Sequence, residues 1–507
     1  MFKISRITFE NFKIFRDFEL DINENVNIFV GDNGSGKSSI LQGIELALSG
    51  SSTKVQNIGL ENLINIEAIN EVLACKDVRR LPKLVIEIYL SLVSTAEPSD
   101  EIYYGENNKL GENTFGVKLV CEPREEYMSD IEACLCTKEP VFPYELYNIY
   151  HQTFKGDRFN PYKKPLEAVF INSSEINSKY ALASTVKATY LSSVTEFERA
   201  QNRQRYKNII NQYEFVGQAK QKGICISSNL EDNLSIEQDG VYIENLGQGE
   251  INVIKTTYAL NRVKDNTSIV CLEEPETHLT HSRMRKMLHE VIQKAERQQI
   301  FVATHSSQIV ARLGLDNVFF IASNAKSTSL KKLNIETANF FRKAPSDSLL
   351  QFILSKKVIL VEGAAEFILM EFFYELVTGN LPEEDNVWII SINGVSFKRY
   401  LQVSMLIGNK VAVIRDNDGS NKPRYVEFCG NNIQVFIDKD EVNRDTFEKC
   451  IYEDNKELCE KILPQTNTLG WMLNNKSETA YRLLSASGTT SLVVPHYIKE
   501  AILWVRR

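Results

Sequence analysis

Short hydrophobic runs recur along the chain and alternate with longer segments of helical periodicity. The first runs predict strands over Ile4–Phe9, Phe18–Ile22 and Val26–Val30. Later runs predict strands over residues 83–92, 269–272, 300–303, 318–321, 358–361, 388–392 and 410–415. Apolar strands that alternate with amphipathic helices are typical of α/β proteins, because the helices cover the faces of the sheet. The hydrophobic pattern therefore predicts an α/β fold.

The same pattern predicts where the chain divides. A length of 507 residues is more than one hydrophobic core supports. The alternation stops at the polar stretch Ser323–Asp347 and restarts at Val358, so we expect one domain over residues 1–349 and a second over 350–507. A polar, helix-prone segment at about 173–221 predicts a helical insertion in the first domain. Its charged positions suit a solvated helix face and a contact surface equally well, and we expect a dimer contact there.

A phosphate-binding loop follows the third predicted strand. The segment Gly31-Asp32-Asn33-Gly34-Ser35-Gly36-Lys37-Ser38 fits the pattern G-x-x-x-x-G-K-[ST], and a helical pattern begins at Ser39. Glycines let backbone N–H groups surround a phosphate, the lysine adds a mobile positive charge, and the serine hydroxyl can ligate Mg²⁺. We expect ATP with Mg²⁺ to be bound here by Asn33, Gly34, Ser35, Gly36, Lys37, Ser38 and Ser39.

Composition and charge narrow the function. The net charge is −8, which argues against a protein that coats nucleic acid through its overall charge. Acids that hold divalent metals can still neutralise phosphates, so an acidic nuclease is physically reasonable. The nine cysteines are scattered, which favours reduced thiols over disulfides or a zinc site. No apolar run reaches the roughly 18 residues of a membrane span, and we expect a cytoplasmic protein without membrane contact.

Consecutive acids close the strand predicted at residues 269–272. Such a strand, ending in Glu273 and Glu274, has the form of a Walker B element. We expect Glu273 to lie at the metal and Glu274 to polarise the water that attacks ATP. His305 follows the next strand, where it can contact a γ-phosphate; a lone histidine is more often structural, but its order after Walker A and Walker B favours a role in ATP binding.

Two further pairs of acids follow strands of the second domain. Glu362 comes directly after the strand 358–361, and Glu366 falls in the first turn of the next predicted helix. Asp416 and Asp418 follow the strand 410–415, and alternate positions on an extended chain point the same way. Because both pairs close hydrophobic strands of one α/β domain, we expect them to meet at a divalent metal site.

The first domain resembles the RecF/SMC-like branch of ABC ATPases. The resemblance rests on Asn11-Phe12-Lys13, the phosphate loop, Glu-Glu-Pro-Glu-Thr-His-Leu at 273–279 and Thr-His-Ser at 304–306. It implies that ATP is sandwiched between two protomers, with a signature loop of one facing the phosphate loop of the other. The matching segment, residues 245–250, contains Gly247 and Gly249. Gly247 stands where the family usually has a serine, so fast hydrolysis is in doubt and ATP could act mainly as a switch.

The second domain resembles the Toprim fold, and the whole chain resembles the OLD (overcoming lysogenization defect) family of ATP-dependent endonucleases. The segment Trp388 to Gly394 matches the strand and glycine turn between the two acidic motifs. The resemblance implies two metals, Mg²⁺ or Mn²⁺, and a lysine. Carried over by motif, one metal is held by Glu362, Asp416 and Asp418, the second by Glu366 with Glu448, and the catalytic groups are Glu362, Asp416 and Lys476. Glu448 suits an ordinary helix start about as well, and Lys476 could be a surface lysine.

These resemblances imply an ATP-regulated endonuclease that cuts DNA and assembles as a dimer or tetramer. They also imply bacterial anti-phage defence, beside either a UvrD-like helicase or a retron reverse transcriptase with its RNA/DNA product. The alternatives are a non-cleaving ATP-switched sensor or scaffold and a RecF-like recombination mediator. The set of acids disfavours the scaffold, because mutually repelling carboxylates gain little from proximity without a metal.

Overall fold

The computed structural model describes most of the chain, and it forms two compact units. The described residues are 2–93, 98–159, 161, 164–172, 183, 186–187, 189–191, 193–213, 227, 229–238, 240–262, 268–295, 298–322, 324–343, 347–393, 396–418, 420, 424–463, 467–486 and 492–507. The first unit comprises Met1–Phe29, Asn33–Thr304 and Ser323–Lys326, and the second comprises Val30–Asp32, His305–Ala322 and Ser327–Arg507. None of the described helices is long and apolar enough to span a bilayer.

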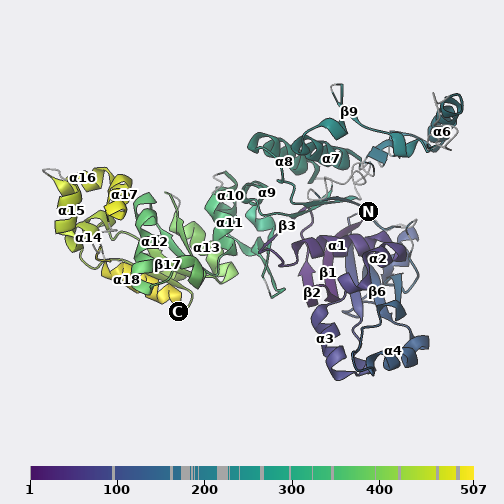
Figure 1. Cartoon of the computed structure of the whole chain (residues 1–507), viewed down its shortest axis with the longest axis horizontal. Helices are drawn as coiled ribbons and strands as arrows, with labels where there is room; N and C mark the ends of the chain where they lie inside the picture. Colours follow the sequence, from purple (N-terminus) through teal and green to yellow (C-terminus); the bar gives the residue numbers. More distant parts are fainter. Residues whose placement is uncertain are drawn as a thin grey trace. The chain divides into compact units, whose positions relative to one another are not determined.

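An antiparallel sheet forms one layer of the first unit. Its strands are β1 (Phe2–Phe12), β2 (Phe15–Asp21), β4 (Leu84–Leu92), β5 (Tyr104–Gly105), β6 (Thr114–Pro123) and β7 (Tyr147–Thr153). Their order is β2-β1-β4-β6-β5, with β7 also paired to β6. Helix α1 (Lys37–Ser49) packs against β4 and β6 (Figure 1). The approach is close, because a Cβ atom on Gly43 of α1 would lie 2.7 Å from the ring of Phe9. The phosphate-loop helix is therefore seated directly on this sheet.

Parallel strands form the second layer of this unit, in the order β3-β12-β11-β8. These strands are β3 (Val26–Gly31), β8 (Glu167–Asn172), β11 (Ser268–Glu273) and β12 (Gln299–Ala303). In the register, Cys271 of β11 lies between Phe301 of β12 and Phe170 of β8. The carboxyl ends of parallel strands lie at one edge of a sheet, so Glu273 and Asn172 come to the same edge.

The remaining elements of the first unit are mostly helices. They are α2 (Ser52–Ile58), α3 (Ile66–Cys75), α4 (Met128–Leu135), α6 (Glu196–Asn211), α7 (Gln248–Arg262) and α8 (His281–Ala295), with a short strand pair β9 (Glu237–Gln238) and β10 (Val241–Tyr242). Helix α6 lies in the expected helical insertion, and its Thr195 and Glu198 form a capping box. Most of the rest of that insertion, including Gln221 at its predicted end, lies outside the described residues.

The second unit contains a four-stranded parallel sheet in the order β16-β15-β17-β18. The strands are β15 (Lys357–Val361), β16 (Val387–Ser391), β17 (Lys410–Ile414) and β18 (Ile433–Phe436). Ile359 and Val361 belong to a core shared with α12 (Ala364–Thr378) and α18 (His496–Arg506). Side chains alternate along a strand, so Val358 and Leu360 point to the opposite face. Helices α11 (Asp347–Leu354) and α13 (Phe397–Ile407) contact the sheet through β16 and β17 (Figure 1).

Further elements complete the second unit. They are α9 (Ser307–Leu313), β13 (Val318–Ile321), β14 (Ser327–Ser329), α10 (Ile335–Lys343), α14 (Phe447–Asp454), α15 (Lys456–Ile462), α16 (Thr468–Asn474) and α17 (Lys476–Ala486). Helices α14 and α17 share the core formed with α12 and α18, through Ile451 and Leu483. Their first residues come close to the acidic ends of the parallel strands, as described below.

The predicted α/β fold class is confirmed, because parallel strands alternate with helices in both units. The predicted strands are present within one to three residues at each end. Strands β6, β7, β8 and β18 were missed, although β6 has a hydrophobic core segment, and so were the short strands β5, β9, β10 and β14. The predicted glycine turn at Gly394 and bend at Gly419 lie outside the described residues. The domain boundary expected near residue 350 stays a prediction.

Candidate nucleotide site and carboxylate cluster

The phosphate loop has the backbone form that its glycines predict. Gly34 has a φ of 76° and Gly36 a φ of 102°, and a Cβ atom on Gly36 would lie 2.5 Å from Cζ of Phe15. Ser35 is 1% exposed, and its hydroxyl oxygen has no hydrogen-bond partner among the described residues. Lys37 is also buried, at 7% exposure, whereas Asn33, Gly34 and Ser38 are exposed and Ser39 is buried. A tight loop with a buried orphan hydroxyl at the start of α1 fits a triphosphate.

A cavity of about 330 Å³ lies beside this loop and α1. It brings together Ser38 and Glu273, the two residues expected to bind Mg²⁺. The cavity is lined by Lys13, Ser38, Leu41, Gln42, Glu45, Phe170, Ile171, Asn172, Cys271 and Glu273. Burial lowers the pKa of Lys13, and the nearby charge of Glu273 opposes that shift. A cation beside Glu273 adds positive charge where a triphosphate would need it.

Several of these lining residues were not predicted as site residues. Lys13 was used only as part of a family motif, and Gln42 and Asn172 were not considered. Gln42 lies four positions after Ser38, so a helical wheel of α1 places both on one face. Asn172 ends β8, whose neighbour β11 ends at Glu273 in the same register. Both signals could have been found by asking which polar residues share the edge of the sheet with Walker B.

The second Walker B acid takes a different direction from the first. Glu274 has a φ of 45°, and its backbone N–H donates to the carbonyl oxygen of Ala303 at 2.8 Å. Glu273 lines the cavity and Glu274 does not. Two residues later, Glu276 accepts a hydrogen bond of 2.7 Å from the hydroxyl of Thr304. The turn therefore separates the two acids, as separate metal and water-polarising roles require.

The signature segment is seated at the start of α7, away from this cavity. Gly247 precedes the helix, and Gly249 lies in its first turn. A Cβ atom on Gly249 would lie 2.2 Å from the carbonyl oxygen of His278, so only glycine permits this contact. Glu250 and Arg283 form an ion pair of 2.6 Å that joins α7 to α8. Neither Gly247, Gly249 nor His305, which follows β12, lines the cavity, so their roles in ATP binding stay predictions.

In the second unit, three acids and a lysine converge from four elements. Asp416 follows β17, Glu366 lies in the first turn of α12, Glu448 in the first turn of α14, and Lys476 at the first residue of α17. Glu366 and Glu448 are buried, and the exposed Glu362 is close enough to act on their charges. We call Glu362, Glu366, Asp416, Glu448 and Lys476 the carboxylate cluster.

The charges of this cluster repel one another strongly. Burial, followed by the charges of Glu366, Glu448 and Glu362, raises the pKa of Asp416 to about 8. Burial and the charges of Glu448 and Glu362 also raise the pKa of Glu366. Burial lowers the pKa of Lys476. The hydrogen bond of 3.0 Å to Glu448 and the charges of the surrounding acids together outweigh this, so the pKa of Lys476 is raised overall. The cluster therefore carries more negative charge than its single lysine can compensate.

The donor set of the cluster fits a hard divalent cation. Carboxylate oxygens are the ligands that Mg²⁺ and Mn²⁺ prefer, and a cation would relieve the repulsion that raises the pKa of Asp416. One oxygen of Asp416 is held by the N–H of Phe447 at 2.7 Å, which leaves the other for a ligand. Within the described residues, no three acid, histidine or cysteine side chains lie close enough together to hold one metal ion as they stand. The cluster thus has the right chemistry without a closed coordination shell.

The two aspartates of the Asp416-Asn417-Asp418 motif do not point the same way, as an extended chain would have required. Asp418 has a φ of 52°, so the chain turns there. Its carboxylate forms ion pairs with Arg415 at 2.6 Å and with Arg424 at 3.1 Å. Asn417, buried between the aspartates, donates to the carbonyl oxygens of Asp438 and Asp440, which holds the turn. The expected orientation of Asp418 was therefore wrong, and its role as a metal ligand stays a prediction.

Comparison with known proteins places this chain in a family. The family model of the AAA ATPase domain matches residues 2–214 and 172–310, more than half of the sequence. The chain belongs to that family. The model described as "Overcoming lysogenization defect protein-like, TOPRIM domain" matches residues 353–418, from the end of α11 to Asp418. An ATPase domain followed by an OLD-like Toprim domain confirms the resemblance to the OLD family.

Curated relatives match short segments of the chain. The DNA replication and repair protein RecF of Colwellia psychrerythraea is 35% identical over 78 residues, which are 15% of this chain and 20% of the relative. RecF of Clostridium botulinum is 28% identical over 159 residues, 29% of this chain and 42% of the relative. The chain thus spans less than half the length of these relatives. The solved C-terminal region of the Burkholderia pseudomallei OLD protein is similar at 15% identity with a TM-score of 0.23, covering 30% of this chain and 97% of that one.

Proposed function

We propose that this protein is an ATP-regulated endonuclease that hydrolyses DNA phosphodiester bonds with Mg²⁺ or Mn²⁺. The observation that carries the proposal is the carboxylate cluster, in which buried acids from separate elements crowd together at the carboxyl end of a parallel sheet. Such crowding is unfavourable without a cation, and ligands bind at this edge of α/β sheets. The OLD-like Toprim match covers Glu362, Glu366 and Asp416.

Each residue of the cluster has a role in this proposal. Asp416, Glu366 and Glu448 would hold the metal ions, with Glu362 and Asp418 completing the shell. Bound metal ions of this kind activate water and stabilise the charge that develops on a scissile phosphate. Lys476, held by Glu448, presents an ammonium group to the same phosphate. Asp418 would have to leave Arg415 and Arg424 to ligate a metal.

ATP regulates the nuclease in this proposal. The phosphate loop binds the triphosphate, Ser38 and Glu273 bind its Mg²⁺, and Glu274 polarises the attacking water. Gly247 and Gly249 lie outside the cavity of their own protomer, which suits contact with the nucleotide of a second protomer. We therefore propose that ATP promotes association of two ATPase domains, and that the insertion containing α6 adds a contact that persists without ATP.

The biological setting is proposed from the family alone. OLD-like effectors suit bacterial anti-phage defence in the cytoplasm. The partner would be a co-encoded helicase or a retron reverse transcriptase with its RNA/DNA product. A pull-down of the protein from cells that express its neighbouring genes would identify the partner.

A cleavage assay tests the nuclease. Plasmid and linear DNA are incubated with the protein, Mg²⁺ or Mn²⁺, with and without ATP and the co-encoded partner. We expect Asp416→Ala and Glu362→Ala to lower cleavage by at least about a hundredfold, because two-metal chemistry fails when one ion is misplaced. Glu427→Ala, a change at an exposed acid of the same unit, serves as the matched control. Equal cleavage by the parent and both cluster variants would remove the nuclease assignment.

A second candidate is a non-cleaving, ATP-switched DNA-binding protein, of which a RecF-like mediator is one form. It is favoured by the similarity of the ATPase segment to RecF and by the pairing of Asp418 with two arginines instead of the cluster. This candidate predicts ATP-dependent DNA binding without cleavage under any metal, with or without the partner. A gel-shift assay in parallel with the cleavage assay separates the two functions.

A further inference from the structure

Strand β16 forms one edge of the Toprim sheet. It pairs in parallel with β15, from Lys357↔Val387 to Val361↔Ser391, and no described strand lies on its other side. An edge strand presents backbone N–H and C=O groups outward at alternate residues, and another strand can pair with them. Proteins usually protect such an edge with charge, bulges or a covering helix.

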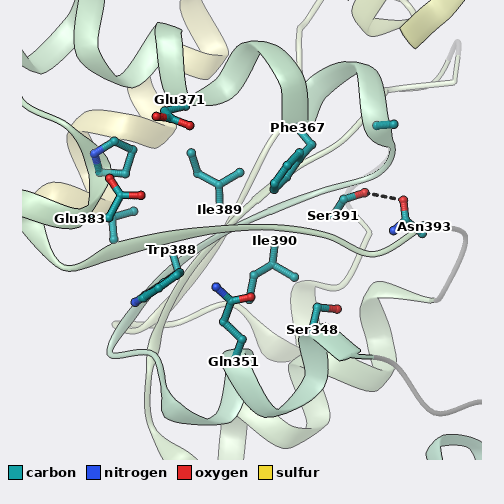
Figure 2. A pocket seen from close by; sticks show the side chains of 13 residues that line it. Ser348, Gln351, Phe367, Glu371, Glu383, Trp388, Ile389, Ile390, Ser391 and Asn393 are labelled. Carbon is teal, nitrogen blue, oxygen red and sulfur yellow. Dashed lines mark hydrogen bonds between the residues drawn. The ribbon is translucent and has the colours of Figure 1, made fainter. Parts of the chain in front are cut away.

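A groove of about 530 Å³ runs along β16. Figure 2 shows that its lining comes from both faces of the strand: Ile389 points toward α12, with Phe367 and Glu371, while Trp388 and Ile390 point toward α11, with Gln351. The groove is therefore not a pocket above the sheet. It follows the edge itself, between two helices that stand apart on either side of the strand.

The lining combines exposed aromatic rings with negatively charged carboxylates. Phe367 is 48% exposed and Trp388 42% exposed, which is high for side chains of this size. Glu371 of α12 and Glu383, in the turn Pro382–Asp385, lie on the same side of the strand (Figure 2). Neither carboxylate has an ion-pair partner within the described part of the chain. Among the described residues, no basic side chain lines the groove.

We propose that the β16 groove binds an extended, basic segment of a partner protein, which adds a strand to the Toprim sheet. Backbone pairing to the edge would supply affinity for any extended chain, and alternate side chains of the segment would determine specificity. Apolar side chains of the segment would cover Trp388 on the α11 side. Lysine or arginine side chains on the α12 side would pair with Glu371 and Glu383.

The same charges weigh against the other possible occupants. A nucleic acid strand is a polyanion, and Glu371 and Glu383 would repel it. A second copy of this chain, pairing β16 with β16 about a twofold axis, would bring four like charges together. None of the carboxylate cluster residues lines the groove, so the segment would bind without occupying the proposed nuclease site.

The probe is a synthetic peptide of alternating valine and lysine, matched to β16 in length and labelled with a fluorophore. A control peptide carries glutamate in place of each lysine. We expect fluorescence anisotropy to show that the parent binds the lysine peptide at least about tenfold more tightly than the glutamate peptide. Glu371→Lys/Glu383→Lys should reverse this preference, because both changes lie at exposed positions and leave the edge intact. Hydrogen exchange should show slower exchange of the amides of residues 387–391 when the lysine peptide is bound, which distinguishes strand addition from loose charge attraction.

The control is Glu500→Lys, a single replacement of the same kind in the groove beside the opposite edge strand, β18. The Glu500→Lys variant should bind the lysine peptide as tightly as the parent does. Cleavage and ATP hydrolysis should be unchanged in the Glu371/Glu383 variant. The proposal is overturned if the variant binds both peptides like the parent, or if the amides of β16 are not protected. The proposal would also be overturned if the peptide did not protect the amides of β16 and a single-stranded oligonucleotide of similar length, or self-association of the parent, did.

Discussion

The phosphate loop and the carboxylate cluster are built in opposite ways. The loop is one contiguous segment whose form depends on backbone dihedral angles at Gly34 and Gly36. The cluster joins Asp416, Glu366 and Glu448, which are separated by tens of residues in sequence and lie on different elements. Backbone N–H groups of the loop are suited to bind an anion, whereas the carboxylates of the cluster are suited to bind cations. A contiguous site tolerates changes elsewhere in the fold, while an assembled one depends on all its elements.

The largest expected effect separates binding from turnover in the contiguous site. Glu274→Gln should slow ATP hydrolysis by about a hundredfold or more while ATP still binds, because the amide keeps the shape of the acid but cannot polarise water. The cluster would allow no such separation, since in the proposed mechanism its acids bind the metals that do the chemistry. Phosphate release and equilibrium ATP binding are the two measurements. A hydrolysis rate equal to that of the parent would move the catalytic role to another residue.

Loss of the loop's charge should come next in size. Lys37→Ala removes a buried ammonium group, and hydrogen bonds to charged groups are worth about 1.5–3 kcal/mol, so ATP affinity should fall about tenfold to a hundredfold. Isothermal titration calorimetry measures it. Metal-dependent cleavage without ATP should be unaffected by this change if the two sites are separately built. Unchanged ATP affinity would contradict the assignment of the loop.

The cluster should show a pH dependence that the loop lacks. The pKa of Asp416 is raised to about 8 in the fold, above its value of 3.8 in an unfolded chain, so the metal-free protein binds an extra proton between these values. The contribution of Asp416 to stability is therefore fully present at low pH and is lost as the pH rises from 3.8 through about 8. Metal must displace that proton, so Mn²⁺ affinity should fall about tenfold for each pH unit below this pKa.

Asp416→Asn provides the control for the pH prediction. The amide removes both the charge and the titration, so the metal-free variant should be more stable than the parent at pH above about 8 and should lose most of the pH dependence. Thermal unfolding in a chelator, followed at several pH values, measures this. If the parent's unfolding temperature in chelator rises with pH through the same range, the acids are not crowded as described.

The smallest effect should come from the backbone of the loop. Gly36→Ala would place a side chain at a φ of 102° and against Phe15, which should destabilise the ATPase unit by about 1–3 kcal/mol. Gly111→Ala, at a φ of 65° with no atom within 4 Å of the added carbon, controls for the positive φ alone. Chemical denaturation of both variants measures the difference. Equal losses would mean that the contact with Phe15 does not matter.

The contrast also explains what could be predicted from the sequence. The loop and the strand that precedes it followed from local patterns, because contiguous residues determine that geometry. The pairing of Ser38 with Glu273 was predicted from two separate motifs, Walker A and Walker B. The proximity of Glu448 and Lys476 to Asp416 came from a family motif, since nothing local indicates that α14 and α17 begin beside β17. The orientation of Asp418 was mispredicted because the alternation of side chains was assumed to continue beyond Ile414, the last residue of β17. The chain turns at Asp418. The β16 groove had no sequence signal, because an edge is defined by which strand is absent.

The close contact between Gly249 and His278 has a mechanical consequence. Atoms packed this tightly resist closer approach, so the first turn of α7 and the chain after β11 are held directly against each other. The ion pair between Glu250 and Arg283 adds a second tie between the same elements. A displacement of Glu273 and its turn would therefore be transmitted to Gly247 and Gly249 through the direct contact between Gly249 and His278. The segment 245–250, which would face a neighbouring protomer, is thus mechanically coupled to the end of β11, which would sense the nucleotide of its own protomer.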